Sequence, residues 1–123
     1  MDKNITMSDL GQFIIETINS VVTNYEMNDE IVNKKNKECQ DFLHSLELDN
    51  LKYAERAKLA TKLQKNRNER RKSKDVVEGY SGLYNVLNYM QNKKVILNFA
   101  NELIRYDRLQ ENKHTRKYVK RIK

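Results

Sequence analysis

The sequence predicts an all-α fold: four to five helices in a small bundle, with one long basic helix and a basic C-terminal tail. The 123 residues contain no proline and only three glycines, whereas a sandwich or barrel of short strands needs turn residues at regular intervals. Apolar residues also recur every three or four positions, as in an amphipathic helix. Because this length suits one domain, we expect residues 1–112 to form a single helical domain and residues 113–123 to form the tail.

The first half of the chain predicts two helices. Ser8 is the expected cap of the first helix, and its apolar stripe comprises Leu10, Phe13, Ile14, Ile18, Val21, Val22 and Tyr25. Asn28 is the expected cap of the second helix, with Asp29 and Glu30 in its first turn. An alternative is that the first helix runs straight into the second, because neither glycine nor proline separates them. A turn is expected at residues 46–50.

A third helix is expected from Leu51 to about Glu78. One face of this helix comprises Leu59, Leu63, Asn66, Arg70, Ser73 and Val77. The same helical spacing continues past Glu78 to Tyr80, Tyr84 and Leu87. The middle of this face is polar, so it is either exposed or paired with Glu38 and Asp41 of the second helix.

The last third of the chain predicts a break and two shorter helical segments. Residues 79–82 contain two glycines and are expected to form a kink or a short break, followed by an apolar segment over residues 83–91. Asn92 is the expected cap of the last helix. One face of that helix comprises Ile96, Phe99, Ala100, Leu103 and Tyr106.

Charge is unevenly spread along the chain, with a net charge of −6 over residues 1–50 and +7 over residues 51–75. The densest basic segment comprises Lys62, Lys65, Arg67, Arg70, Arg71, Lys72 and Lys74. Lysine and arginine neutralise phosphates, so the segment predicts binding to nucleic acid or to a nucleoprotein complex, with Asn66 and Asn68 as further hydrogen-bonding groups. The alternative is a solvated helix face with internal ion pairs.

The C-terminal tail carries a net charge of +6 over residues 113–123. Its bases surround one aromatic ring, a pattern that suits phosphate contact with base stacking. The expected binding residues of the tail are Arg116, Lys117, Tyr118, Lys120 and Arg121. The alternative is a disordered solubilising tail.

Tyrosines suggest a further contact surface, because a tyrosine ring packs while its hydroxyl stays in water. We expect Tyr80, Tyr84 and Tyr106 to pack at helix edges. Tyr89 is the expected partner-binding residue at the surface.

The residue inventory predicts a protein that is not an enzyme, with no catalytic residues, no cofactor and no metal. Cys39 and His44 are five residues apart and point to different sides of a helix. No glycine-rich phosphate loop is present. A single cysteine favours the cytosol, and no apolar run approaches the roughly 20 residues of a membrane span. The oligomeric state is open, and a dimer is one alternative.

The middle of the chain shows a family resemblance. The strings LHSLE (residues 43–47), ERA (55–57), LATKLQ (59–64) and RNERRKSKD (67–75) resemble small accessory proteins of phages and prophages of Gram-positive bacteria. The resemblance covers about residues 43–87 and implies action in the cytoplasm of a bacterial host. Because the group includes anti-CRISPR proteins, which block an RNA-guided nuclease, an alternative function is protein-directed inhibition of a bacterial defence nuclease. A helical oligomerising structural protein is a further alternative.

Overall fold

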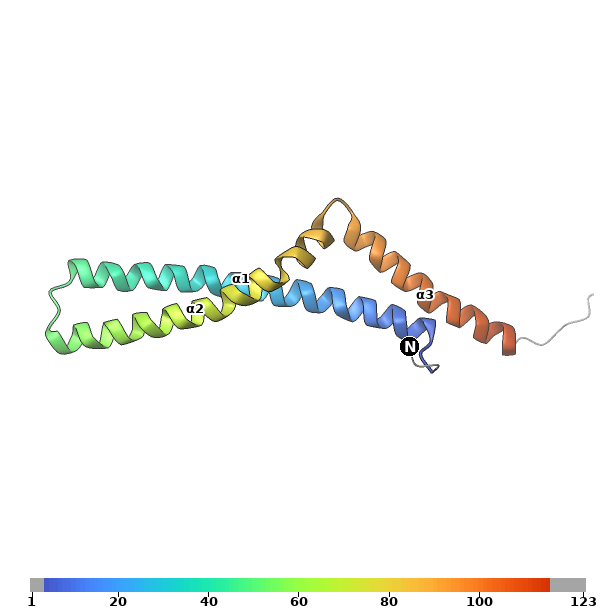
Figure 1. The fold of residues 1–123 in the computed structure, drawn as a ribbon, viewed down its shortest axis with the longest axis horizontal. Helices are drawn as coiled ribbons and strands as arrows, with labels where there is room; N and C mark the ends of the chain where they lie inside the picture. The colour runs from blue at the N-terminus through green and yellow to red at the C-terminus, as the bar shows by residue number, and fades with distance from the viewer. Residues whose placement is uncertain (1–3, 116–123) are drawn as a thin grey trace, which may run out of the picture. The chain divides into compact units, whose positions relative to one another are not determined.

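The computed structural model describes residues 4–115, and within them it contains helices and turns but no strand. The helices are α1 (Met7–Leu48), α2 (Tyr53–Asn88) and α3 (Asn92–Thr115). The all-α prediction is confirmed, whereas the prediction of four to five helices is wrong. Figure 1 shows the three helices and the two turns that join them.

Two of the expected helix boundaries are absent, and this accounts for the smaller number of helices. Asn28 does not cap a helix: it lies inside α1, and its side-chain amide donates to the carbonyl of Asn24 at 2.8 Å. The alternative of one continuous helix across this point is therefore confirmed. Residues 79–82 likewise lie inside α2 without a break. The expected turn near residues 46–50 and the start of the last helix at Asn92 are confirmed.

The start of α1 differs from the prediction, because Thr6 rather than Ser8 is the capping residue. The Thr6 hydroxyl accepts from the Asp9 backbone N–H at 3.0 Å, and the Asp9 carboxylate accepts from the Thr6 N–H at 3.2 Å. This reciprocal pair is a capping box. The backbone N–H of Ser8 instead donates to the carboxylate of Asp107 on α3.

The described helices form two compact units, and the first combines residues up to Ser20 with those from Val86 onwards. Here α1 and α3 run antiparallel and cross closely at Gly11. A Cβ atom on Gly11 would lie 2.5 Å from the Ala100 carbonyl oxygen and 2.9 Å from Cγ1 of Ile104. Gly11 and Ala100 are buried at this crossing, and Ile18 is buried two turns further along α1. The absence of a side chain at residue 11 therefore permits the close approach of the two backbones.

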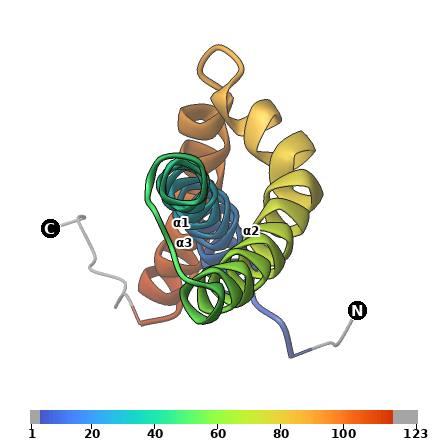
Figure 2. The same cartoon turned by 90° about the vertical axis from the view of Figure 1, so that its left-hand side faces the viewer.

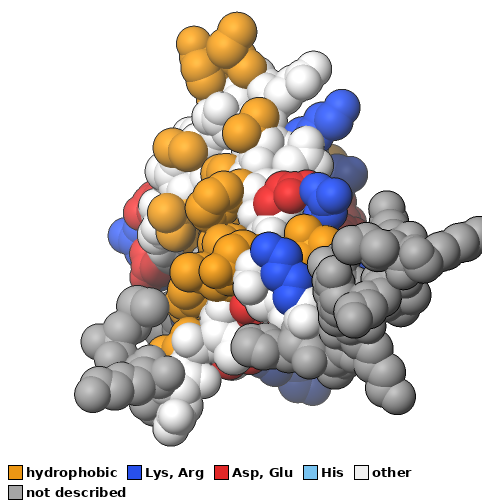
Figure 3. Space-filling model, turned by 90° about the vertical axis from the view of Figure 1, so that its right-hand side faces the viewer, with side chains coloured by type: hydrophobic (Ala, Val, Ile, Leu, Met, Phe, Trp, Pro, Cys, Tyr) orange, Lys and Arg blue, Asp and Glu red, His pale blue; other side chains and the backbone are white. Residues whose placement is uncertain are grey.

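Three aromatic residues expected on packed faces of this unit are exposed instead: Phe13, Phe99 and Tyr106. The row of α3 residues that packs comprises Ile96, Ala100 and Leu103. Phe99 and Tyr106 project to one side of this row, so their rings stay in water. Exposed hydrophobic side chains on the face of this unit that is turned to the viewer are visible in Figure 3.

The second unit, Val21–Asn85, is a hairpin of the rest of α1 and most of α2. The two helices lie side by side and antiparallel, joined by the turn after Leu48, which faces the viewer in Figure 2. The face predicted for α2 is confirmed, since all its members are buried or half-buried: Leu59, Leu63, Asn66, Arg70, Ser73, Val77, Tyr80, Tyr84 and Leu87. The Tyr84 ring stacks on Tyr25 with centroids 3.9 Å apart, and its hydroxyl donates to Glu26 at 2.9 Å.

Candidate nucleic-acid interface

The basic segment of α2 forms two stripes rather than one surface. Helical spacing places Arg67, Arg70, Arg71 and Lys74 at i, i+3, i+4 and i+7, and we call this stripe the arginine edge. Lys62, Lys65, Glu69 and Lys72 lie at i, i+3, i+7 and i+10 on the other side, and we call this stripe the lysine edge. The buried residues Asn66 and Ser73 lie between the two edges.

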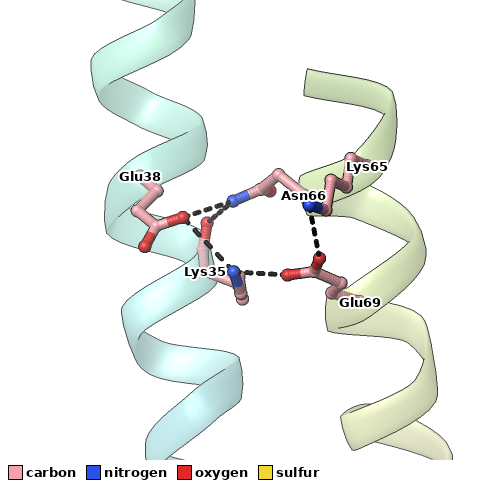
Figure 4. Close-up of polar contacts among 5 residues, drawn as sticks. All are labelled: Lys35, Glu38, Lys65, Asn66 and Glu69. Atoms are coloured by element: carbon pink, nitrogen blue, oxygen red, sulfur yellow. Dashed lines mark hydrogen bonds and ion pairs between the residues drawn. The ribbon is translucent and has the colours of Figure 1, made fainter. Parts of the chain in front are cut away.

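The lysine edge is paired with α1 through a small charged network, shown in Figure 4. The Lys35 Nζ atom lies 2.6 Å from Oε2 of Glu69 and 3.5 Å from Oε2 of Glu38. Lys65 approaches the other oxygen of Glu69 at 3.9 Å, and its side chain is mostly exposed. Lys62 lines the same small hollow beside this network. The lysine edge therefore balances part of its own charge.

The Lys35–Glu69 contact also changes the acid–base behaviour of both groups. The hydrogen bond to Glu69 raises the pKa of Lys35 above its usual value of 10.5. The hydrogen bond from Lys35 lowers the pKa of Glu69 below its usual value of 4.5. Each charged form stabilises the other, as expected for an ion pair across two helices.

Asn66 anchors the network from inside the hairpin. Its side chain is 3% exposed, and its amide nitrogen donates to the Lys35 carbonyl at 3.1 Å and to Glu38 at 3.2 Å. Because both partners are acceptors, the amide orientation is determined. The Oδ1 atom has no hydrogen-bond partner among the described residues. Asn66 is thus a structural residue, and the expectation that it contacts nucleic acid is wrong because ligand cannot reach it.

The predicted pairing of the polar face of α2 with α1 is confirmed for Glu38. Asp41, the other expected partner, is exposed, and no hydrogen bond or ion pair joins it to α2 within the described residues. Asp41 lies two positions after the buried Cys39, and residues two apart do not share a face of a helix. The hairpin therefore uses one carboxylate of α1 in this network.

The arginine edge has a different character. Arg70 is half-buried, and its Nε donates to Oδ1 of Asn36 on α1 at 2.7 Å. Arg67 is exposed, and its Nη1 lies 3.8 Å from the sulfur of Cys39. Arg71 is exposed and Lys74 half-buried, and neither forms an ion pair or side-chain hydrogen bond within residues 4–115. No ion pair joins a carboxylate to this edge within those residues.

A shortage of carboxylates explains why the lysine edge forms ion pairs and the arginine edge does not. Residues 31–40 of α1 and 56–74 of α2 contain twelve lysines and arginines but only two acids, Glu38 and Glu69. Both acids contact Lys35. The arginine edge thus carries a local excess of positive charge, which strengthens the local field. Asp75 and Glu78 follow Arg71 and Lys74 by four residues, but no ion pair joins them among the described residues.

The remaining predicted site residues do not belong to the hairpin unit Val21–Asn85. Tyr89 is 66% exposed and lies in the turn between α2 and α3. The tail residues Arg116, Lys117, Tyr118, Lys120 and Arg121 lie outside the described residues. Their expected role stays a prediction.

Within residues 4–115, no three histidine, cysteine, aspartate or glutamate side chains are grouped as metal ligands would be. None of the three helices, over the residues described, combines the length and apolarity of a membrane span. No protein-family model matches the chain, and neither a curated protein nor a solved structure matches it.

Proposed function

We propose that the protein is a non-enzymatic, phage-type accessory protein that binds nucleic acid, alone or in a nucleoprotein complex, through the arginine edge. The observation that carries the proposal is the separation of charge across the hairpin. Glu38 and Glu69 both contact Lys35, and Arg67, Arg71 and Lys74 form no ion pair within the described residues. Arginine side chains that are free of carboxylates are suited to phosphate oxygens.

Neighbouring amide groups of α1 support this proposal. Asn36 contacts Arg70, so the side of α1 that carries Asn36 borders the arginine edge. Asn33 and Gln40 lie three and four residues from Asn36 and share that side. Both are exposed. Neutral amides beside arginines add hydrogen bonds to sugars, phosphates or base edges without reducing the positive charge.

A matched pair of charge reversals tests which edge binds. Arg71→Glu with Lys74→Glu alters the arginine edge, and Lys62→Glu with Lys72→Glu alters the lysine edge by the same net charge. Arg70 is left unchanged because its bond to Asn36 gives it a structural role. Circular dichroism verifies that both double variants keep the wild-type helicity.

Binding is measured by fluorescence anisotropy with short duplex DNA, single-stranded DNA and structured RNA over a range of salt concentrations. We expect the arginine-edge variant to lose at least about tenfold in affinity. Its log–log salt slope should be less steep by about 2, since two phosphate contacts are removed. The lysine-edge variant should bind within about threefold of wild type at the salt concentrations where screening is strong. Equal losses in both variants would show that net charge alone attracts the ligand.

The tail is tested separately with a chain that ends at Thr115. We expect a less steep salt slope than that of the full chain, because four expected cationic contact residues are removed. Complete absence of binding at low salt by the full chain would contradict the proposal. The remaining hypotheses would then be the inhibitor of a defence nuclease and the oligomerising structural protein.

A further inference from the structure

The turn between α2 and α3 borders a second surface, which shares no residue with the arginine edge. A groove of about 580 Å³ opens there, in the size range of ligand and peptide pockets. Leu87 and Leu97 contribute apolar side chains, and three asparagines and a glutamine contribute amides. Met90, Lys93 and Lys94 complete the lining. We call this surface the corner groove.

Met90 is placed there at a conformational cost. Its φ angle is 51°, in the left-handed region that glycine and asparagine adopt more readily than methionine. Its side chain is 82% exposed, so packing within the described residues does not compensate for this conformation. A strained residue with an exposed apolar side chain fits a contact function better than a role in stability. Hydrophobic side chains protrude at the top of Figure 3, where this turn lies.

The charge of the corner groove indicates the chemistry of its occupant. No aspartate or glutamate occurs between Val86 and Asn101, and the only charged residues there are Lys93 and Lys94. Both lysines are exposed and form no ion pair within residues 4–115. The occupant therefore gains from carrying negative charge.

The apolar part of the lining favours a peptide over a nucleic acid. Leu87, Met90 and Leu97 present aliphatic and thioether groups, whereas bases stack on aromatic rings. Methionine is adaptable and frequent at peptide-binding surfaces. The amides on the lining can both donate and accept, which matches the alternating groups of a peptide backbone. Tyr89, exposed in the same turn, is of the type enriched at protein interfaces.

We propose that the corner groove docks a peptide segment of a protein partner. The segment inserts an apolar side chain against Leu87 and Leu97 and places carboxylates beside Lys93 and Lys94. This proposal goes beyond nucleic-acid binding and does not depend on it, because the arginine edge supplies no residue to the groove.

A random dodecapeptide library displayed on phage, selected against the immobilised full chain, tests the proposal. We expect the enriched sequences to combine an apolar residue with neighbouring aspartate or glutamate. A synthetic peptide of the enriched sequence should lose at least tenfold in affinity for Met90→Gly, and likewise for Lys93→Glu with Lys94→Glu. It should bind the lysine-edge variant of α2, Lys62→Glu with Lys72→Glu, with wild-type affinity.

Thermal unfolding of Met90→Gly distinguishes a contact residue from a structural one. Because glycine relieves the left-handed conformation, we expect the Tm to rise while peptide affinity falls. A fall in both would assign Met90 a structural role and overturn its place in the proposal.

Three further results would overturn the peptide assignment. One is enrichment of peptides without acidic residues, or of none at all. A second is perturbation of the amide NMR signals of residues 86–101 by single-stranded DNA or RNA, which would place nucleic acid in the groove. A third is a dimer in sedimentation velocity that dissociates in Met90→Gly, which would make a second copy the occupant. None of these results bears on the arginine edge.

Discussion

Lys35 of α1 and Glu69 of α2 form the closest ion pair between the two helices of the hairpin among the described residues, with Nζ and Oε2 2.6 Å apart. Each residue has further partners on the same side of the hairpin, Glu38 for the lysine and Lys65 for the carboxylate. The pair therefore directs the Glu69 carboxylate toward Lys35 and Lys65 and not toward the arginine edge.

The Lys35–Glu69 pair predicts how stability depends on pH. The lowered pKa of Glu69 means that its stabilising effect is present above about pH 4.5 and is lost as the pH falls through the lowered value. The raised pKa of Lys35 means that its effect is present below about pH 10.5 and is lost as the pH rises through the raised value. Urea unfolding midpoints measured from below the pKa of Glu69 to above the pKa of Lys35 should show both declines.

Glu69→Gln isolates the contribution of the carboxylate. We expect the variant to be less stable than wild type at neutral pH and to lose less stability on acidification. Glu78→Gln, at an exposed carboxylate of the same helix, is the control and should keep the wild-type acid decline. An unchanged acid decline in Glu69→Gln would show that the pair does not contribute to the pH dependence.

A small change at Asn66 is expected to lower the free energy of unfolding strongly. In Asn66→Asp the amide donor to Glu38 and to the Lys35 carbonyl is lost, and a carboxylate faces another carboxylate. We expect a loss of about 1–3 kcal/mol in the free energy of unfolding. The same substitution at exposed Asn68, two residues away, should cost less than about 0.5 kcal/mol. Urea titrations of both variants make the comparison, and equal losses would contradict the buried role of Asn66.

Gly11 and Gly82 predict opposite outcomes for one substitution. Gly11→Ala places a Cβ against the Ala100 carbonyl oxygen and should destabilise by about 1–3 kcal/mol. A Cβ at Gly82 meets no atom within 4 Å inside α2, so Gly82→Ala should stabilise by about 0.5–1 kcal/mol. Thermal unfolding measures both effects. A neutral Gly11→Ala would mean that α1 and α3 do not cross closely at this point.

The start of α1 offers a test of its capping residue. Thr6→Ala removes the hydroxyl that accepts from Asp9 and should cost about 1 kcal/mol. Ser8→Ala keeps the backbone N–H that donates to Asp107 and should change stability by less than about 0.5 kcal/mol. Chemical denaturation of the two variants ranks them. The reverse order would restore Ser8 as the cap.

The buried face of α2 was predictable from the sequence, including its polar members. Helical periodicity determines which residues share a face, so the sequence alone places Asn66 and Ser73 on the same face as Val77, and all three are buried. The turn after Leu48 was predictable for a similar reason, because short polar residues interrupt the apolar pattern there.

Helix boundaries were harder to predict because the chain carries few strong breakers. Asn28 is a favourable cap, yet inside a helix it bonds the carbonyl of Asn24 and is tolerated. Gly79 and Gly82 weaken a helix without ending it, and both lie within α2. The exposure of Phe99 depends on which side of α3 meets α1, and the pattern of one helix does not contain that information.

The division of the basic segment into two edges follows from helical spacing alone, and the sequence could have revealed it. The neutralisation of one edge could not be inferred in this way. It depends on the alignment of α1 with α2, which brings Lys35 beside Glu69 although they are 34 positions apart along the chain. Similarly, the φ angle of Met90 has no signal in the sequence, since a glycine or asparagine would be the usual residue there.

The buried amide of Asn66 has a consequence for the alignment of the hairpin. A slip of α2 by one turn would displace this amide by about 5.4 Å along α1. Its N–H groups would then lose both acceptors and remain buried without partners, which costs free energy. An apolar side chain at this position would carry no such cost. A single polar side chain thus selects one register among several that apolar contacts alone would allow. The same register keeps Arg70 opposite Asn36, so the alignment of the arginine edge with α1 depends on a residue that no ligand touches.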